Sequence, residues 1–547
     1  MSSLCLWEFT EALFDHYKPK WYIIKISKNE KKDEKKDEKM QNLPIGIQTF
    51  PKLMAKNYLY VDKTEHIHRM IVQGSVYFLS RPRRFGKSLL ISTLNEIFDG
   101  NKKLFKGLWI HNTDYAWEKH PVVRIDFSKG KAENKEELKV FILNQLKNIA
   151  DKYGVTLERD QYYEAFDELL SKLSQINKVA VLIDEYDKPI IDNIENPELA
   201  VELREILKGF YTIIKACDEH ITFVLLTGVS KFSKAGVFSG LNNLEDISMD
   251  TQYSSLLGIT LQEMKTCFKD HINRFAKYEG IQKPELIEKI KYWYNGFCFS
   301  KNCTKVFNPF SVLLLFKKFD FGNYWFESAT PSFLIKLIKE KDFEIKKLRQ
   351  MEVRAESLGA YELENLAVLP LLFQTGYLTI KGYDKDFMTY ILGYPNFEVE
   401  NSFQYALLNN YSNMHVDNYL IDLIKALRND DFDTFFDTLR IFFAKIPYDL
   451  QIKKEKYYQT IFYLIFSLIG LKVEAEVKTN KGRIDAVIID KDVYIFEFKF
   501  NGDKDRALNQ IKDKKYFEKY QEINKEIYLF GVEFADRNIG DWIVEKI

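Results

Sequence analysis

Four short apolar runs constrain the fold of this 547-residue chain more than any other feature. Segments with helical spacing, such as 87–98 and 135–150, separate them. Continuously apolar strands that alternate with helices indicate a parallel sheet that helices cover on both faces. Such sheets bind ligands beyond the carboxyl ends of their strands. The runs are SVYFLS, PVVRIDF, KVAVLID and ITFVLLTG, at 75–80, 121–127, 178–184 and 221–228.

The first run leads into RPRRFGKSLLISTL, which resembles a phosphate-binding loop between a strand and a helix. Such a loop reads Gly, four residues, then Gly-Lys-Ser/Thr. Gly86, Lys87 and Ser88 fit this pattern, whereas Arg81 stands where the first glycine is expected. We expect the helix N-terminus and Lys87 to bind the phosphates of ATP and the Ser88 hydroxyl to hold Mg²⁺. The alternative is a basic turn that binds no ligand.

A second motif, VLIDEYD, ends the third run with two acidic residues. Asp184 and Glu185 follow a buried strand, where paired carboxylates are costly unless a metal or another partner is present. We expect Asp184 to hold Mg²⁺ indirectly and Glu185 to act as general base on the attacking water. The two motifs together predict nucleotide binding.

Three further polar residues are weaker candidates in the same region. Thr227 ends the next strand and is interpreted either as a polar sensor of the nucleotide or as a simple cap of the strand end. Arg83 and Arg84 are candidates for phosphate contact, with acidic neighbours as the alternative partners. The aromatic stretch 293–299 is interpreted as core in preference to a base-stacking platform.

A different pattern occurs near the end of the chain, in GRIDAVIIDKDVYIFEFKF at 482–500. It fits two strands joined by a turn at 490–492. Glu497 and Lys499 share one face of the second strand, and aromatic residues take the other face, so this strand is predicted to be central. Asp485 of the first strand and Glu497 are then expected to bind Mg²⁺ or Mn²⁺. Lys499 would position the attacking water and the scissile phosphate.

This Asp…Glu-X-Lys arrangement is typical of restriction-type nucleases, whose chemistry needs a metal and an activated water. Two alternatives stay open. One is a Glu–Lys ion pair on a sheet, with Asp485 at a turn. The other is a metal site that persists for binding without cleavage.

The chain is similar to proteins that fuse an AAA-ATPase-like domain to a PD-(D/E)XK nuclease-like domain. The similarity covers 43–316 and the last hundred residues, and arginine is usual in that family where Arg81 stands. It is carried by RPRRFGKSLLISTL, VLIDEYDKPI, LTGVSKFSKAGVFSGLNNLEDIS and YWYNGFCF…VFNPFS.

The resemblance also implies roles for residues around the C-terminal motif. Glu455 matches an acidic residue on the family's helix before the sheet, and Gln459 stands where many relatives have histidine. Gln510 and Tyr516 match a motif on the helix after the lysine strand. Nearby lysines are candidates for contacts with backbone phosphates: Lys512, Lys514 and Lys515.

These patterns predict an α/β protein with three folded parts. They are an N-terminal P-loop NTPase with a parallel sheet, a mostly helical middle region, and a C-terminal restriction-endonuclease-like α/β domain. The longest apolar run, 460–471, is too short to span a bilayer and is predicted to be a buried helix. The expected bounds are 1–42 for an extension with a charged linker, 43–257 for the ATPase, 258–447 for the connecting region and 448–547 for the nuclease-like domain.

Charge and cysteine content limit the partners and the compartment. Lys+Arg and Asp+Glu both number 79, which argues against a protein that coats a polyanion but leaves room for a local basic groove. The five cysteines form no zinc pattern and are predicted to be free thiols. The N-terminus does not read as a signal peptide. We therefore expect a cytoplasmic protein without a membrane partner, and a homo-oligomer stays open.

The predicted function is an ATP-regulated, metal-dependent nuclease that acts on nucleic acid. DNA is favoured over RNA as its substrate. A role in defence or in the maintenance of mobile elements rests on analogy between folds. The alternative is a nucleotide-switched scaffold that binds nucleic acid or protein without cleaving. The intact set of Asp485, Glu497 and Lys499 favours the nuclease.

Overall fold

The computed structural model divides the chain into a unit that spans Met1–Met40 and a unit that spans Gln41–Ile547. The predicted N-terminal extension up to residue 39 lies outside the described residues. The structure describes residues 40–231, 237–238, 241–327, 332–359, 366–446, 455–469, 472–479, 482–500, 503–522, 524–535 and 538–547.

A five-stranded parallel sheet forms the N-terminal part, in the order β2-β3-β4-β1-β5. Its four longer strands fall on the four apolar runs of the sequence, so the predicted parallel α/β fold is confirmed. Strand β3 is fully buried along its whole length, as its apolar run before Asp184 predicts. The strands are β1 (Val76–Ser80), β2 (Val122–Asp126), β3 (Val179–Asp184), β4 (Ile221–Gly228) and β5 (Glu245–Asp246).

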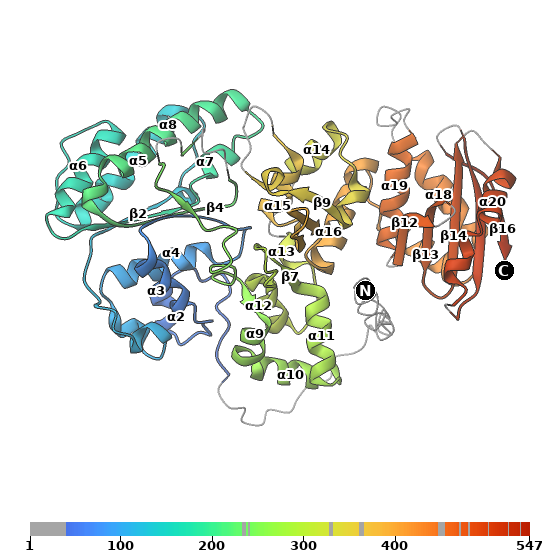
Figure 1. The fold of residues 1–547 in the computed structure, drawn as a ribbon, viewed down its shortest axis with the longest axis horizontal. Helices are drawn as coiled ribbons and strands as arrows, with labels where there is room; N and C mark the ends of the chain where they lie inside the picture. Colours follow the sequence, from blue (N-terminus) through green and yellow to red (C-terminus); the bar gives the residue numbers. More distant parts are fainter. Residues whose placement is uncertain are drawn as a thin grey trace. The chain divides into compact units, whose positions relative to one another are not determined.

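Helices cover both faces of this sheet (Figure 1). On one side α5 (Lys135–Lys152), α6 (Tyr162–Ser174) and α8 (Pro197–Ala216) pack against one another, and the short α7 (Lys188–Ile191) lies against α8. On the other side α4 (Lys87–Phe98) contacts the central strands, next to α2 (Phe50–Ala55) and α3 (Thr64–Gln73). Helix α4 begins where β1 and the glycine-lysine motif predict it.

The middle region is mostly helical, as predicted. The segment predicted as helical at 261–280 forms two helices, because the chain leaves helical geometry at Phe268. The helices are α9 (Leu261–Cys267), α10 (Lys269–Glu279), α11 (Lys283–Tyr294), α12 (Pro309–Lys318), α13 (Tyr324–Glu327), α14 (Ser332–Glu340), α15 (Val368–Thr375), α16 (Phe397–Ser412), α17 (Asp417–Arg428) and α18 (Phe432–Ala444).

Two small sheets in this region were not expected from the sequence. Their strands are two to six residues long, too short for a clear period-two pattern. One sheet has the order β6-β8-β7 and the other β10-β11-β9. The strands are β6 (Ile259–Thr260), β7 (Asn295–Phe297), β8 (Val306–Phe307), β9 (Met351–Arg354), β10 (Thr379–Asp384) and β11 (Thr389–Gly393).

A second five-stranded sheet follows, in the order β12-β13-β14-β15-β16, with β14 in the centre as predicted. Strands β14 and β15 are parallel, and the other neighbours are antiparallel. The elements are α19 (Glu455–Leu468), β12 (Lys472–Thr479), β13 (Gly482–Ile489), β14 (Val493–Phe500), α20 (Lys504–Asp513), β15 (Ile527–Ala535) and β16 (Asn538–Lys546).

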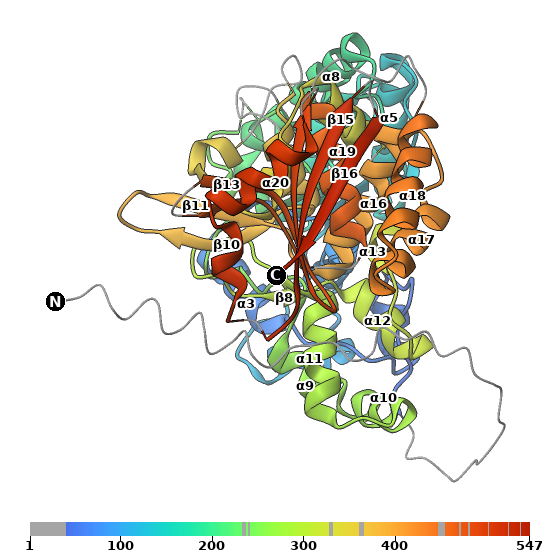
Figure 2. The same ribbon diagram turned by 90° about the vertical axis from the view of Figure 1, so that its right-hand side faces the viewer.

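The two faces of β14 are covered by different helices (Figure 2). On the aromatic face, the ring of Phe496 lies 5.1 Å from that of Phe466 in α19 and 6.2 Å from that of Phe435 in α18. On the other face, Val493 and Ile495 join a buried cluster with residues of α20. Within the described part of the chain, none of the helices has the length and apolar character of a membrane span.

Candidate nucleotide and nuclease sites

The loop between β1 and α4 has the backbone geometry of an anion-binding turn. Gly86 stands before the first residue of α4 with φ 99°, and Arg84 also takes a left-handed φ of 67°. Among the described residues, no side chain caps the N-terminus of α4. The first-turn N–H groups of a helix have no partner within the helix, so they can donate to a phosphate placed here.

Lys87 is buried and curls back over its own loop. Its Nζ donates to the carbonyl oxygens of Arg81 at 2.8 Å and of Pro82 at 3.0 Å. Burial lowers the pKa of Lys87, while the nearby carboxylates, Asp184 foremost, oppose this shift. The ammonium group thus lies inside the loop with neutral acceptors, where a phosphate would supply an anionic one.

Arg81 has a structural role that explains how it fits at a glycine position. Its guanidinium donates to the carbonyl oxygens of Ser80 at 2.9 Å and of Ser248 at 2.6 Å. It also lies 4.3 Å from the ring centroid of Phe299, and burial lowers its pKa to about 10. Arg81 therefore ties the end of β1 to the segment after β5 and to the middle region.

Asp184 is buried at the end of β3 and is held by its neighbour strand. The Thr227 hydroxyl, in β4, donates to Asp184 Oδ1 at 2.7 Å. This hydrogen bond fixes the orientation of the Asp184 carboxylate, which was predicted from the sequence to hold Mg²⁺ indirectly. The role of Thr227 as a sensor stays a prediction, now with a defined partner.

Glu185 combines a strained backbone with a perturbed carboxyl group. Its φ is 52°, which is uncommon for a residue with a side chain and typically costs about 1–3 kcal/mol. Burial raises the pKa of Glu185, and the charge of Lys87 opposes the rise. Strain of this kind concentrates at active sites, and a raised pKa suits a group that must accept a proton.

Sequence reasoning missed Asp187, a third acidic residue of the same motif. Its buried Oδ2 accepts hydrogen bonds from the backbone N–H of Val229 at 3.0 Å and of Ser230 at 2.6 Å. Burial raises its pKa. A Cβ on Gly228 would lie 2.6 Å from Asp187 Oδ1, so only glycine fits there. The last acid in DEYD was the signal, and its partners lie about forty residues away.

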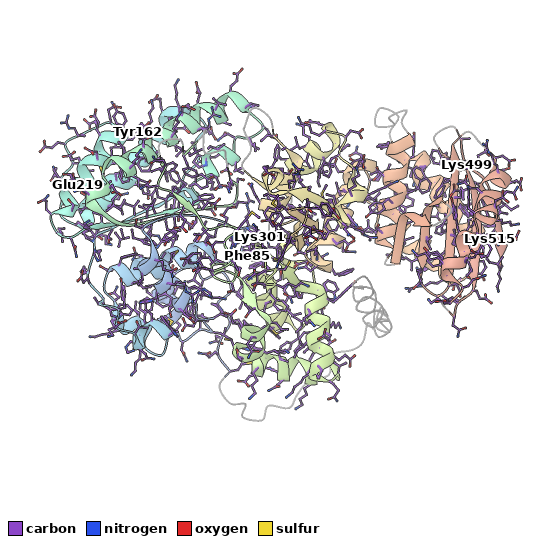
Figure 3. The ribbon with its side chains drawn as sticks, in the orientation of Figure 1. Phe85, Tyr162, Glu219, Lys301, Lys499 and Lys515 are labelled. Carbon is purple, nitrogen blue, oxygen red and sulfur yellow. The ribbon has the colours of Figure 1, made fainter. Side chains whose placement is uncertain are left out.

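The arginines and aromatic residues next to the loop contact the middle region. The Arg84 guanidinium lies 5.1 Å from the ring centroid of Phe310, and the Arg83 carbonyl accepts a hydrogen bond from Trp325. Phe85, labelled in Figure 3, packs edge-on against Phe297 and Phe299. Both of these rings are buried, as the interpretation of 293–299 as core requires.

The second site centres on Glu497, a buried carboxylate in the middle of β14. Its Oε1 accepts hydrogen bonds from Lys499 Nζ at 3.0 Å and from the side-chain amide of Gln510. Lys499, which Figure 3 labels, is partly exposed. Three groups that were predicted to act together therefore meet at one point: a buried carboxylate, a lysine and an amide.

Asp485 and Glu455 are placed by their backbone, because their side chains lie outside the described residues. Asp485 precedes Ala486 in β13, and Ala486 is the Cα partner of Phe496 in β14. Asp485 thus lies one register position further on, next to Glu497. Glu455 is the first residue of α19.

A glycine lets α20 approach the sheet closely enough to reach Glu497. Gly531 of β15 is the Cα partner of Glu497. A Cβ on Gly531 would lie 2.2 Å from the carbonyl oxygen of Lys504 and 2.7 Å from the backbone nitrogen of Leu508. This close contact holds α20 over β14 and β15 and brings Gln510 to the carboxylate.

The prediction that Gln510 and Tyr516 share one helix is wrong. Helix α20 ends at Asp513, and Lys515 takes a left-handed φ of 49°. Tyr516 instead begins a short 3₁₀ helix, Tyr516–Tyr520, and is buried in the core.

Two of the lysines predicted to touch phosphates are engaged in ion pairs. Lys512 pairs with Glu545, and Lys515, labelled in Figure 3, pairs with Glu518 at 3.4 Å. Each would have to leave its partner to bind a phosphate.

Comparisons with known proteins match the two parts of the chain that carry these candidate sites. Residues 44–238 match a family model described as a predicted AAA-ATPase, and residues 453–542 match the PD-(D/E)XK nuclease superfamily. A protein of Azotobacter chroococcum mcd 1, described as an uncharacterized protein in the vnfD 5' region, is 40% identical over 528 residues. That similarity covers 93% of this chain and 99% of the relative.

A solved structure, the ORC2 protein of Aeropyrum pernix in its ADPNP and ADP complexes, is similar at 13% identity and a TM-score of 0.23. The match covers 65% of this chain and 98% of that one. A likeness this slight carries no argument about function.

Proposed function

The chain belongs to a family that joins a predicted AAA-ATPase domain to a PD-(D/E)XK nuclease domain, and from this premise we propose an ATP-regulated, metal-dependent nuclease. The observation that carries the proposal is the convergence of Lys499 and Gln510 on the buried carboxylate of Glu497. DNA is the proposed substrate, and the cytoplasm is the proposed compartment. A role in defence or in mobile-element maintenance is proposed by analogy alone.

In the ATPase module, the residues around the phosphate loop suit a nucleotide with Mg²⁺. Lys87 would exchange its carbonyl acceptors for phosphate oxygens, while Gly86 and Arg84 shape the loop around them. Ser88 would hold the metal directly and Asp184 through water. Glu185 would accept the proton of the attacking water.

In the nuclease module, Asp485 and Glu497 would hold Mg²⁺ or Mn²⁺ through carboxylate oxygens. Such an ion neutralises phosphate charge and makes its bound water more acidic. Lys499 would orient the water against the scissile phosphate, and Gln510 would keep Glu497 in place. Glu455 would add a further acidic group from α19. Glu497 fits this role because a buried carboxylate is best stabilised by cations.

The decisive experiment is a cleavage assay of the full chain on plasmid, linear and single-stranded DNA and on RNA. It is run with Mg²⁺ or Mn²⁺, with and without ATP. We expect the wild type to cleave and Glu497→Gln to lose cleavage, because the substitution removes an anionic ligand. Equal cleavage by both proteins would contradict the assignment of this site.

Nucleotide binding is tested by calorimetry with ATP and Mg²⁺. Lys87→Ala removes a charge-assisted hydrogen bond worth roughly 1.5–3 kcal/mol, so most of the affinity should be lost. Lys52→Ala, on the exposed side of α2, is the matched control and should bind as the wild type does. Equal affinity of the Lys87 variant would rule out the phosphate loop.

One observation favours a second candidate, a nucleotide-switched scaffold that binds without cleaving. Glu497 already has a cation and an amide as hydrogen-bond donors, an arrangement that satisfies an ion pair as well as a metal site. ATP binding by a wild type that cleaves none of these substrates would favour this candidate.

A further inference from the structure

The middle region is hydrogen-bonded to the backbone of the phosphate loop through one tryptophan. Trp325, in the short helix α13, is buried, and its indole Nε1–H donates to the carbonyl oxygen of Arg83 at 3.0 Å. Arg83 lies two residues before Phe85 inside the loop. The ring of Trp325 also packs 5.9 Å from Phe297 and 5.4 Å from Tyr377. Any rearrangement of the loop that moves the Arg83 carbonyl therefore acts on Trp325.

Trp325 is in turn held by a buried carboxyl group on another helix. Glu398, the second residue of α16, is fully buried. Its Oε1 accepts the backbone N–H of Trp325 at 2.6 Å, and its Oε2 accepts the Ser311 hydroxyl at 2.9 Å. A buried acid is costly unless it is hydrogen-bonded, and here its hydrogen bonds fix α13 to the start of α16.

The same helix α16 contacts α19 of the nuclease module, directly near its far end and through Arg349 near its start. The carbonyl oxygen of Tyr411 accepts the buried Tyr457 hydroxyl of α19 at 2.8 Å. Glu400 pairs with Arg349 at 2.7 Å, and the Arg349 guanidinium lies 5.6 Å from the ring of Tyr463, also in α19. Helix α16 has 16 residues and so spans about 24 Å.

Resting on the proposed function, we propose that Trp325 is a positioning residue of the phosphate loop and that α16 transmits the state of this loop to α19. Packed helices move as rigid bodies because close-packed interiors resist continuous deformation. A shift of Trp325 would move Glu398 and with it α16, and the contacts of Tyr411 and Glu400 would carry this shift to α19. That helix begins at Glu455, one of the proposed nuclease acids.

The test measures hydrogen exchange in α19 with and without a non-hydrolysable ATP analogue and Mg²⁺, beside calorimetry of the same analogue. We expect nucleotide to change exchange in α19 of the wild type. Trp325→Phe keeps a ring but loses the N–H donor, so affinity should fall roughly 2- to 10-fold and the α19 response should shrink. Tyr457→Phe should bind nucleotide as the wild type does and lose most of the α19 response.

Two further variants serve as a control and as a replacement. Tyr278→Phe alters an exposed tyrosine of α10 in the same way and should change neither readout. Arg349→Gln breaks the second contact and replaces Tyr457→Phe if that variant fails to fold. An unchanged α19 in a wild type that binds nucleotide would overturn the inference and leave nucleotide binding intact. A full response in both Tyr457→Phe and Arg349→Gln would also overturn it. A wild type that binds no nucleotide would overturn the proposed function itself.

Discussion

Lys87 and Glu497 are ionisable residues that lie in buried surroundings, and each is stabilised in a different way. Lys87 donates hydrogen bonds to two backbone carbonyls, whereas Glu497 accepts hydrogen bonds from the ammonium group of Lys499 and the side-chain amide of Gln510. Removing one partner of such a group leaves its desolvation uncompensated. Variants at these positions therefore need melting curves beside activity measurements, because lost function and lost folding must be told apart.

Substitution of Glu185 separates hydrolysis from binding. Glu185→Gln keeps the shape of the side chain but cannot accept a proton, so ATP should stay bound while turnover falls about 10²-fold or more. Phosphate release and calorimetry measure the two effects. Hydrolysis at the wild-type rate would show that another group serves as the base.

Glu497 and Lys499 should differ in their effect on the metal. Glu497→Gln should weaken Mg²⁺ or Mn²⁺ binding and abolish cleavage, because it removes an anionic ligand. Lys499→Ala should abolish cleavage with the metal still bound, because an ammonium is not a ligand. Metal titration of both variants decides this, with Lys504→Ala, which loses a surface pair with Asp541, as the control. If both changes only lower the melting temperature, the residues form a structural ion pair.

Glu398 should make the stability of the protein depend on pH. Burial raises its pKa to about 8 from an ordinary 4.5, and the charge of Glu327 adds to the rise. Between about pH 4.5 and pH 8, Glu398 therefore keeps its proton in the folded state and loses it in the unfolded state. The stabilising contribution is complete below about pH 4.5 and is lost as pH rises through 8. Glu398→Gln should remove this decline, so the melting temperature of the wild type relative to the variant should fall between pH 5 and pH 8. A constant difference would contradict the raised pKa.

At the scale of elements, Gly531 decides how closely α20 lies on the second sheet. A methyl group there meets backbone atoms of α20 at 2.2 and 2.7 Å, so Gly531→Ala must push the helix away. We expect a lower melting temperature and weaker cleavage, because Gln510 moves with the helix. Gly382→Ala in β10 is the control, since its Cβ would meet Ile391 at an ordinary 3.4 Å. Equal melting temperatures for the two variants would show that α20 adapts easily.

The long elements were predictable from the sequence because their burial leaves a clear pattern. Strands β1 to β4 are mostly apolar, and α4 begins at Lys87 as its motif indicates. The short strands β6 to β9 leave too few residues for any pattern. The helical spacing around Gln510 continues past Lys515, and the left-handed backbone at that residue has no counterpart in the spacing.

The candidate sites were predictable where a charged residue interrupts an apolar pattern, as at Asp184 and Glu497. They were not predictable where a role depends on a distant partner. Trp325 meets Arg83 across 242 positions and Glu398 across 73. Such contacts follow from tertiary packing, which one sequence does not reveal.

For the whole molecule, bound nucleotide should stabilise the N-terminal part selectively. A ligand that binds only the folded state at a hundred times its Kd adds about 2.7 kcal/mol. ATP with Mg²⁺ should therefore raise the melting temperature of the transition that involves the first sheet, and Lys87→Ala should abolish this rise. Calorimetric scans with and without nucleotide measure it. An equal rise in the variant would place the nucleotide elsewhere.

The hydrogen bonds from Lys87 to the carbonyls of Arg81 and Pro82 would also affect how nucleotide exchanges at the proposed site. At the proposed site, an incoming triphosphate would have to compete with the protein's own backbone for this ammonium group, and not only with water. Displacing these backbone carbonyls would use part of the gross binding energy and so lower the affinity for the nucleotide. We expect a site that fills and empties as the surrounding ATP concentration varies.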